Sequence, residues 1–157
     1  MAVTTAGRVR TVPGVAAVAA LILVLAFGNP SYVDWANRHA SPDTAWGFFL
    51  RTLAWPSWSF SSTQSVQNLL ANDLRAILLV VFTAVFMAML VGSRGSISQV
   101  LAGWAAFIFA GAAAGLIASL FLSHPSLLGA FQAAAPGAVY GLFVGWIMGL
   151  VTLMARS

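Results

Sequence analysis

Four long stretches of this sequence carry no charged residue, and this feature limits the fold more than any other. They run from Pro13 to Gly28, from Ala76 to Gly92, from about Val100 to Leu122 and from about Leu127 to Ala155. A helix needs about 20 largely apolar residues to cross the hydrocarbon core of a bilayer. Only 6% of the residues are charged, against about 25% in soluble domains. The sequence therefore predicts an all-α integral membrane protein with four transmembrane helices.

We expect residues 1–157 to form a single membrane domain. Its parts are expected in this order: a first transmembrane helix at about 12–29, an outer loop at about 30–62, a second helix with an outward extension at about 62–92, a third at about 97–123 and a fourth at about 125–155. The first segment also has features of a secretory signal, because Arg8 and Arg10 precede a short apolar run. We favour an uncleaved helix, in which both arginines help to set the orientation.

The arginines are distributed unevenly between the two sides of this four-helix arrangement. One side holds Arg8, Arg10, Arg94 and Arg156 and no acidic residue, whereas the arginines and aspartates of the other side cancel. Basic residues are retained on the cytoplasmic side, so we expect both termini to be cytoplasmic and the Trp-rich loop to be extracytoplasmic. The absence of lysine is typical of GC-rich coding and favours a multi-pass protein of a bacterial inner (plasma) membrane. The positive charge then reflects topology, and no nucleic-acid partner is expected.

The outer loop is rich in tryptophan and is expected to contain a short interfacial helix. Ser41 and Pro42 give a helix start, and Pro56 ends the element. Four apolar residues follow at i, i+3, i+4 and i+7 and predict a membrane anchor: Trp46, Phe49, Leu50 and Leu53. A lid or docking surface for a lipid or partner is the functional alternative. Asp73, at the start of the second transmembrane helix, is expected to pair with Arg38 or Arg51.

Glycines recur every fourth residue in the last apolar segment, in the manner of a glycine zipper. Small residues at this spacing let membrane helices approach closely. The predicted helix-packing residues are Gly103, Gly111 and Gly115 in the third helix and Gly137, Gly141, Gly145 and Gly149 in the fourth. We favour packing between these two helices of one chain. An interface between chains and a glycine-lined path for a solute are the alternatives.

A candidate polar site lies in the outer half of the fourth helix. Pro136 leaves the carbonyl of Gln132 without its usual amide donor, and Tyr140 adds a hydroxyl. Polar groups at a broken helix can mark a binding site in transporters. The simpler interpretation is that Gln132 bonds to a neighbouring helix.

Catalytic and metal chemistry finds little support in the sequence. The chain contains no Cys and only two His and three Asp, and their spacing matches no metal or catalytic signature. No charged side chain lies inside the apolar segments, although proton-coupled carriers and voltage sensors usually hold one there. We therefore expect no catalytic residue, no metal site and no cofactor.

Three functional hypotheses remain. The leading one is a non-enzymatic accessory or structural subunit, with membrane lipid and either other membrane subunits or copies of itself as partners. The second is a transport or lipid-handling protein with a site near Gln132 and Pro136. The third is a membrane enzyme that uses the outer Asp34, His39, Asp43 and Asp73 on a lipid-linked substrate. A solvent-accessible cavity reaching Gln132 would favour the second.

Overall fold

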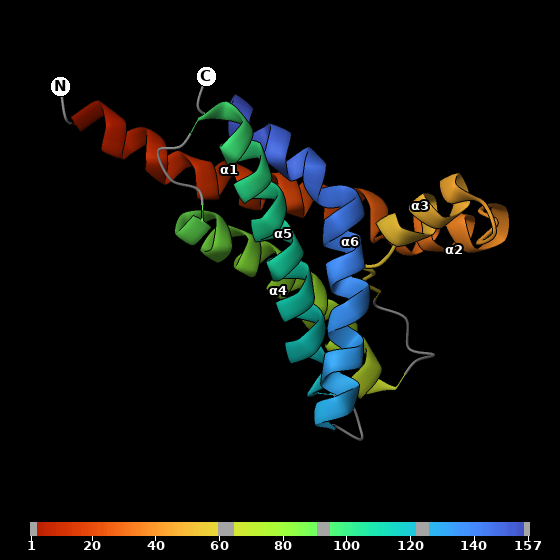
Figure 1. Ribbon diagram of the computed structural model, residues 1–157. Helices are drawn as coiled ribbons and strands as arrows, with labels where there is room; N and C mark the ends of the chain where they lie inside the picture. Colours follow the sequence, from red (N-terminus) through yellow and green to blue (C-terminus); the bar gives the residue numbers. More distant parts are fainter. Residues whose placement is uncertain (1–2, 60–64, 91–94, 122–125, 156–157) are drawn as a thin grey trace.

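The computed structural model describes residues 3–59, 65–90, 95–121 and 126–155. Within these ranges all regular secondary structure is helical, and no strand occurs. The helices, shown in Figure 1, are α1 Val3–Phe27, α2 Pro30–His39, α3 Ala45–Leu53, α4 Val66–Leu90, α5 Ser96–Ser119 and α6 Leu127–Met154.

Three of these helices, α4, α5 and α6, are each long and apolar enough to cross a membrane. The first predicted span differs from the expectation. The part of α1 from Val12 to Phe27 does not meet this criterion of length and apolar character by itself. It meets the criterion only together with α2, Pro30–His39, and the two are bent by 61° relative to each other. The described part of the chain therefore holds three helices able to span a membrane, or four spans if the bent pair counts as one.

The corner between α1 and α2 depends on Gly28. The Trp58 amide donates to the Gly28 carbonyl at 3.0 Å, and a side chain at position 28 would collide with the Pro56 carbonyl oxygen. Helix α2 was not predicted from the sequence, although Asn29 caps it by accepting a hydrogen bond from the Tyr32 amide at 2.9 Å. The Asn29-Pro30 pair was the overlooked signal, because proline is favoured at a first helical position.

Helix α3 begins later than predicted. Thr44, and not Ser41, is its N-cap, and the Thr44 hydroxyl accepts from the Gly47 amide at 3.1 Å. Ser41 instead belongs to the preceding turn, where its carbonyl accepts from the Thr44 amide at 3.4 Å. The prediction of Ser41 as the capping residue was therefore wrong, because a nearer hydroxyl took that position.

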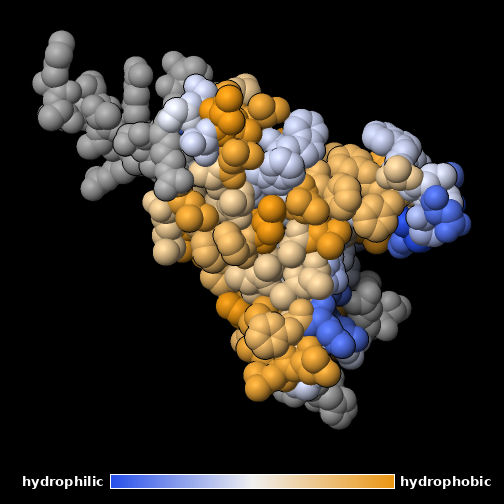
Figure 2. Space-filling view, in the orientation of Figure 1, coloured by the Kyte–Doolittle hydropathy of each residue, from blue (hydrophilic) through white to orange (hydrophobic). Residues whose placement is uncertain are grey.

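The helices pack in a chain of pairs. Helices α5 and α6 form the most extensive pair, α4 packs on α5, and α1 packs mainly on α4. Both termini lie toward the same end of the molecule, whereas α2 and α3 project to one side (Figure 1). Hydrophobic residues cover most of the face shown in Figure 2, and hydrophilic residues gather at the α2–α3 end and in a smaller area lower on the bundle.

Helix α3 packs against the side of α6. The rings of Phe48 and Phe143 meet edge to face with centroids 5.4 Å apart. The extension of α4 also contacts this region, since the Ser59 amide donates to the Asp73 carboxylate at 3.3 Å. Phe143 lies well inside α6, so α3 packs beside the helix bundle and not at its end.

Candidate functional site

Trp55 lies where the outer segment meets the helix bundle. Its ring stacks on that of Tyr140 at a centroid distance of 5.3 Å, and the guanidinium carbon of Arg75 lies 5.0 Å from its centroid. A side chain added at Gly137 would approach the indole to 3.0 Å, and one at Gly115 would approach it to 3.4 Å. Trp55 therefore contacts all three long apolar helices, because these residues belong to α4, α5 and α6.

A hollow lies beside Trp55, between α3, α4 and α6. Its volume is about 840 Å³, and we call it the Arg75 cleft. It is lined by Val33, Asn37, Pro42, Phe48, Arg51, Thr52, Ala54, Trp55, Ser57, Arg75, Gln132, Ala135, Pro136 and Val139. The lining thus combines two arginines and two amides with a larger apolar wall.

A smaller hollow of about 280 Å³ adjoins the Arg75 cleft. Trp55, Arg75 and Pro136 line both hollows. Gly115 and Ser119 of α5 line only the smaller one. The stacked Trp55 and Arg75 therefore form a wall that the two hollows share.

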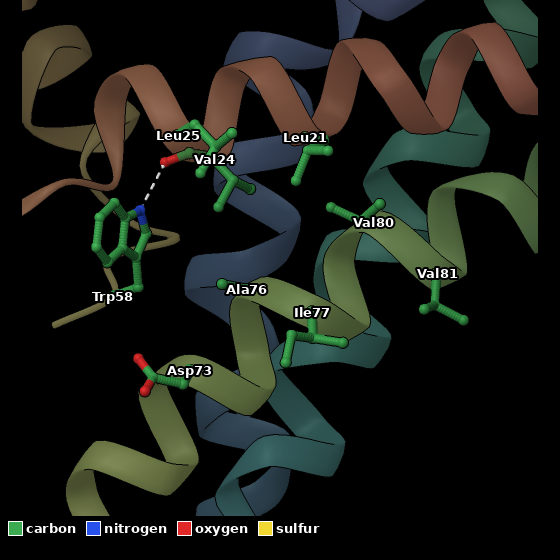
Figure 3. Close-up of a pocket in the computed structure, with 9 residues that line it drawn as sticks. All are labelled: Leu21, Val24, Leu25, Trp58, Asp73, Ala76, Ile77, Val80 and Val81. Atoms are coloured by element: carbon green, nitrogen blue, oxygen red, sulfur yellow. Dashed lines mark hydrogen bonds between the residues drawn. The ribbon is translucent and has the colours of Figure 1, made fainter. Parts of the chain in front are cut away.

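An apolar groove of about 490 Å³ lies between α1 and α4. Figure 3 shows aliphatic side chains from both helices along it, with Trp58 and Asp73 toward one end. The Trp58 indole nitrogen donates to the Val24 carbonyl at 3.2 Å and ties this end to α1. The aliphatic lining, Leu21, Val24, Leu25, Ala76, Ile77, Val80 and Val81, resembles any lipid-facing surface and defines no specific ligand.

Both arginines of the Arg75 cleft have neutral hydrogen-bond partners. Arg75 Nη2 donates to Asn72 Oδ1 at 3.1 Å and to Ser57 Oγ at 3.3 Å. Arg51 Nη2 contacts the carbonyl and the side-chain oxygen of Asn37, both at 3.4 Å. The Nε atom of each arginine is buried and has no partner among the described residues. The predicted pairing of Asp73 with Arg38 or Arg51 does not occur there, because Asp73 accepts from the Ser59 amide.

The structure separates the three residues of the predicted polar site. Gln132 and Pro136 are exposed and line the Arg75 cleft. Tyr140 is fully buried, with Phe107 5.6 Å away between ring centroids, and its hydroxyl has no partner among the described groups. Tyr140 is therefore a packing residue beneath Trp55 and does not line the cleft.

The predicted interfacial anchor also divides into two groups. Trp46 is 69% exposed, as a membrane-contacting side chain would be in the absence of lipid. Leu53 is buried, and Phe49 and Leu50 are partly buried against the core. Phe49, Leu50 and Leu53 pack α3 against the hydrophobic core. Trp46 is therefore the most exposed of the four predicted anchor residues.

The predicted glycines lie along the contact between α5 and α6. A side chain at Gly111 would collide with the Gly137 carbonyl, and one at Gly115 with the Ala133 carbonyl. Added Cβ atoms at the other positions would lie within 2.5 to 2.7 Å of the opposite helix, at Gly103, Gly141, Gly145 and Gly149. All seven glycines therefore face another part of this same chain.

Gln99 is a buried polar residue that the sequence analysis missed. Its side-chain nitrogen donates to the Thr152 carbonyl at 2.8 Å and links the start of α5 to the end of α6. The last carbonyls of a helix lack a donor from their own helix. An amide side chain near the end of an apolar segment can supply this donor, and this signal could have identified Gln99.

The outer acidic and histidine residues do not form a catalytic cluster. His39 Nδ1 lies 3.0 Å from the Trp35 carbonyl, and its ring stacks on Trp35. Asp34 and Asp43 are exposed. Among the described residues, no group of three or more His, Cys, Asp or Glu is placed to hold a metal ion. His124 lies outside the described residues. These contacts offer no support for the enzyme hypothesis.

Comparison of the chain with models of protein families, with curated proteins and with solved structures gives no match. The geometry alone therefore defines the class of protein: an all-helical chain, in its described part, with apolar helices able to span a membrane and a cleft of mixed polar and apolar lining beside them.

Proposed function

We propose that this chain is a lipid-handling membrane protein that binds one amphiphilic molecule in the Arg75 cleft. The single observation that carries the proposal is the composition of that cleft. Arg51, Arg75 and Gln132 supply polar groups, whereas Phe48 and Val139 supply apolar surface. Ligand sites are typically hollows of about 300 to 1,000 Å³ with a mainly apolar lining and a few polar groups.

Handling of a lipid fits this chain better than ion-coupled transport. The four apolar segments contain no charged residue, so they hold no acidic or basic group to relay a proton at depth. The charged residues of the cleft come from α3 and from the early turns of α4. We therefore propose binding or presentation of an amphiphile from one leaflet.

The accessory-subunit hypothesis keeps one of its two motivations. It was motivated by the lack of charged groups inside the apolar segments and by the surface of small residues available for packing. The close approaches of Gly111, Gly137 and Gly141 are to residues of the same chain, so this surface is occupied. Association with a partner would need a different surface.

We further propose a multi-pass location in a bacterial inner membrane, with both termini cytoplasmic and the α2–α3 segment entering the bundle from the outer side. The uneven distribution of arginine supports this orientation. The cleft would then open toward the outer leaflet. Lipid of that leaflet is the expected source of the ligand.

The proposal is tested by filling the cleft. Ala135 is exposed on α6 and lines the cleft, so Ala135→Phe should block ligand entry. Ala88 is exposed on α4 and lines none of the three hollows described above, so Ala88→Phe is the matched control. Native mass spectrometry after mild detergent extraction should show one retained amphiphile on the unmodified protein and on Ala88→Phe, and none on Ala135→Phe. Equal retention by both variants would refute the proposal.

A further inference from the structure

Two positive charges reach the Arg75 cleft from different elements. Arg51 comes from the last turn of α3, and Arg75 comes from α4. Both side chains are partly buried. A buried or partly buried charge is costly unless an opposite charge compensates it. The cleft therefore favours a negatively charged ligand over a neutral one.

The chain itself supplies no such charge at this place. The lining of the cleft contains no Asp or Glu. The hydrogen bonds of both guanidiniums go to amide, hydroxyl and carbonyl oxygens. The Nε donors of Arg51 and Arg75 are left without a partner among the described groups. Two positive charges without an acidic partner thus line one hollow.

Asp73, the nearest acidic residue to Arg75 in the sequence, is directed to the other side of α4. It lines the apolar groove facing α1, as Figure 3 shows, whereas Arg75 lines the cleft facing α6. Two positions along a helix differ by about 200°. The carboxylate of Asp73 also accepts the Ser59 amide. Helix α4 therefore separates its acidic and basic side chains into different hollows.

We infer that the Arg75 cleft binds the phosphate or carboxylate headgroup of an anionic membrane lipid. The inference rests on the proposed function and names the chemistry of its ligand. Arg51 and Arg75 contact the anionic oxygens, since guanidinium groups suit phosphate and carboxylate geometry. The Gln132 side chain supplies an amide donor at the same hollow. Phe48 and Val139 contact the first part of the apolar chain.

The aromatic support of Arg75 strengthens this inference. The guanidinium lies over the Trp55 ring, and Asn72 and Ser57 hold one of its terminal nitrogens. A guanidinium that is fixed before the ligand arrives loses less conformational freedom on binding. The arrangement therefore gives the cleft a pre-positioned cation.

The test compares lipids that differ in charge. The full-length protein is placed in nanodiscs of phosphatidylcholine with phosphatidylglycerol, and the retained lipid is identified by native mass spectrometry. The unmodified protein should retain phosphatidylglycerol over phosphatidylcholine by about tenfold, and Arg51→Gln should reduce that preference to about equal retention. Arg38→Gln is the matched control, because Arg38 is exposed and bonds the Asp34 carbonyl of its own helix. Arg75→Gln should behave like Arg51→Gln if its melting temperature shows that it folds.

Each further outcome has a defined meaning. Equal retention of the two lipids by the unmodified protein, or an unchanged preference in Arg51→Gln, would overturn the inference. If Ala135→Phe still blocked lipid retention in that case, the proposed function would stand without the anionic headgroup. Inorganic phosphate distinguishes a free anion from a lipid: it should not displace phosphatidylglycerol at millimolar concentration. Binding of phosphate with no lipid retained would overturn the lipid as the source.

Discussion

The guanidinium of Arg75 lies over the indole of Trp55, with its central carbon 5.0 Å from the ring centroid. This contact joins α4 to the segment after α3, and the stack of Trp55 on Tyr140 extends the connection to α6. An aromatic ring beneath a guanidinium stabilises it by cation–π attraction. The wall of the cleft therefore depends on one tryptophan from a loop.

Removal of Trp55 should destabilise the protein. Trp55→Ala deletes contacts to three helices and is expected to lower the free energy of unfolding by about 3 to 5 kcal/mol. Thermal unfolding in detergent measures the change. Trp46→Ala is the matched control, since Trp46 is 69% exposed, and should change stability by about 0.5 kcal/mol at most. A similar loss of unfolding free energy in both variants would show that the contacts of Trp55 with the three helices do not stabilise the fold.

A large side chain in the α5–α6 contact should also be costly. A Cβ atom at Gly141 would lie 2.5 Å from the Ile108 Cα, and backbone cannot move aside as a side chain can. Gly141→Leu should lower the free energy of unfolding by about 1 to 3 kcal/mol. Gly14→Leu is the control, because a Cβ there meets nothing within 4 Å. Tolerance of Leu at Gly141 would contradict the close packing.

Two tyrosines make a matched test of buried hydroxyls. The Tyr140 hydroxyl is buried and has no partner among the described residues, whereas the Tyr32 hydroxyl donates to the Leu50 carbonyl at 2.9 Å. Tyr140→Phe should raise the free energy of unfolding by about 1 kcal/mol, and Tyr32→Phe should lower it by about 0.5 to 1.5 kcal/mol. A clear loss of stability in Tyr140→Phe would mean that its hydroxyl is satisfied.

The orientation can be measured with single cysteines, because the chain has none of its own. Ser31 in α2 and Ser96 at the start of α5 are both exposed. Cysteine at position 31 should react with an impermeant thiol reagent on intact cells, and cysteine at position 96 should react only after permeabilisation. The reverse pattern would invert the proposed topology.

The long helices and their apolar character followed from the sequence, because hydrophobic length is a local property. The corner at Gly28 and the helix α2 that follows it were missed, since Gly28 makes this corner by allowing the close approach of Pro56, which lies far along the chain. The cleft was only partly foreseen. Gln132 and Pro136 were identified from their own helix, but Arg51 and Arg75 meet in one hollow because of the path taken by the segment around Trp55. Helical periodicity cannot encode such a path.

Cross-linking from inside the Arg75 cleft tests the central claim most directly. A photoreactive phenylalanine analogue at Val139, which lines the cleft, is compared with one at Met89, which is 73% exposed and lines none of the three hollows. Irradiation in nanodiscs of phosphatidylcholine with phosphatidylglycerol should join phosphatidylglycerol selectively to position 139, and should join both lipids at position 89 in proportion to their abundance. If position 139 captured no lipid, or captured both lipids in the same proportion as position 89, the cleft would not be a binding site for an anionic lipid.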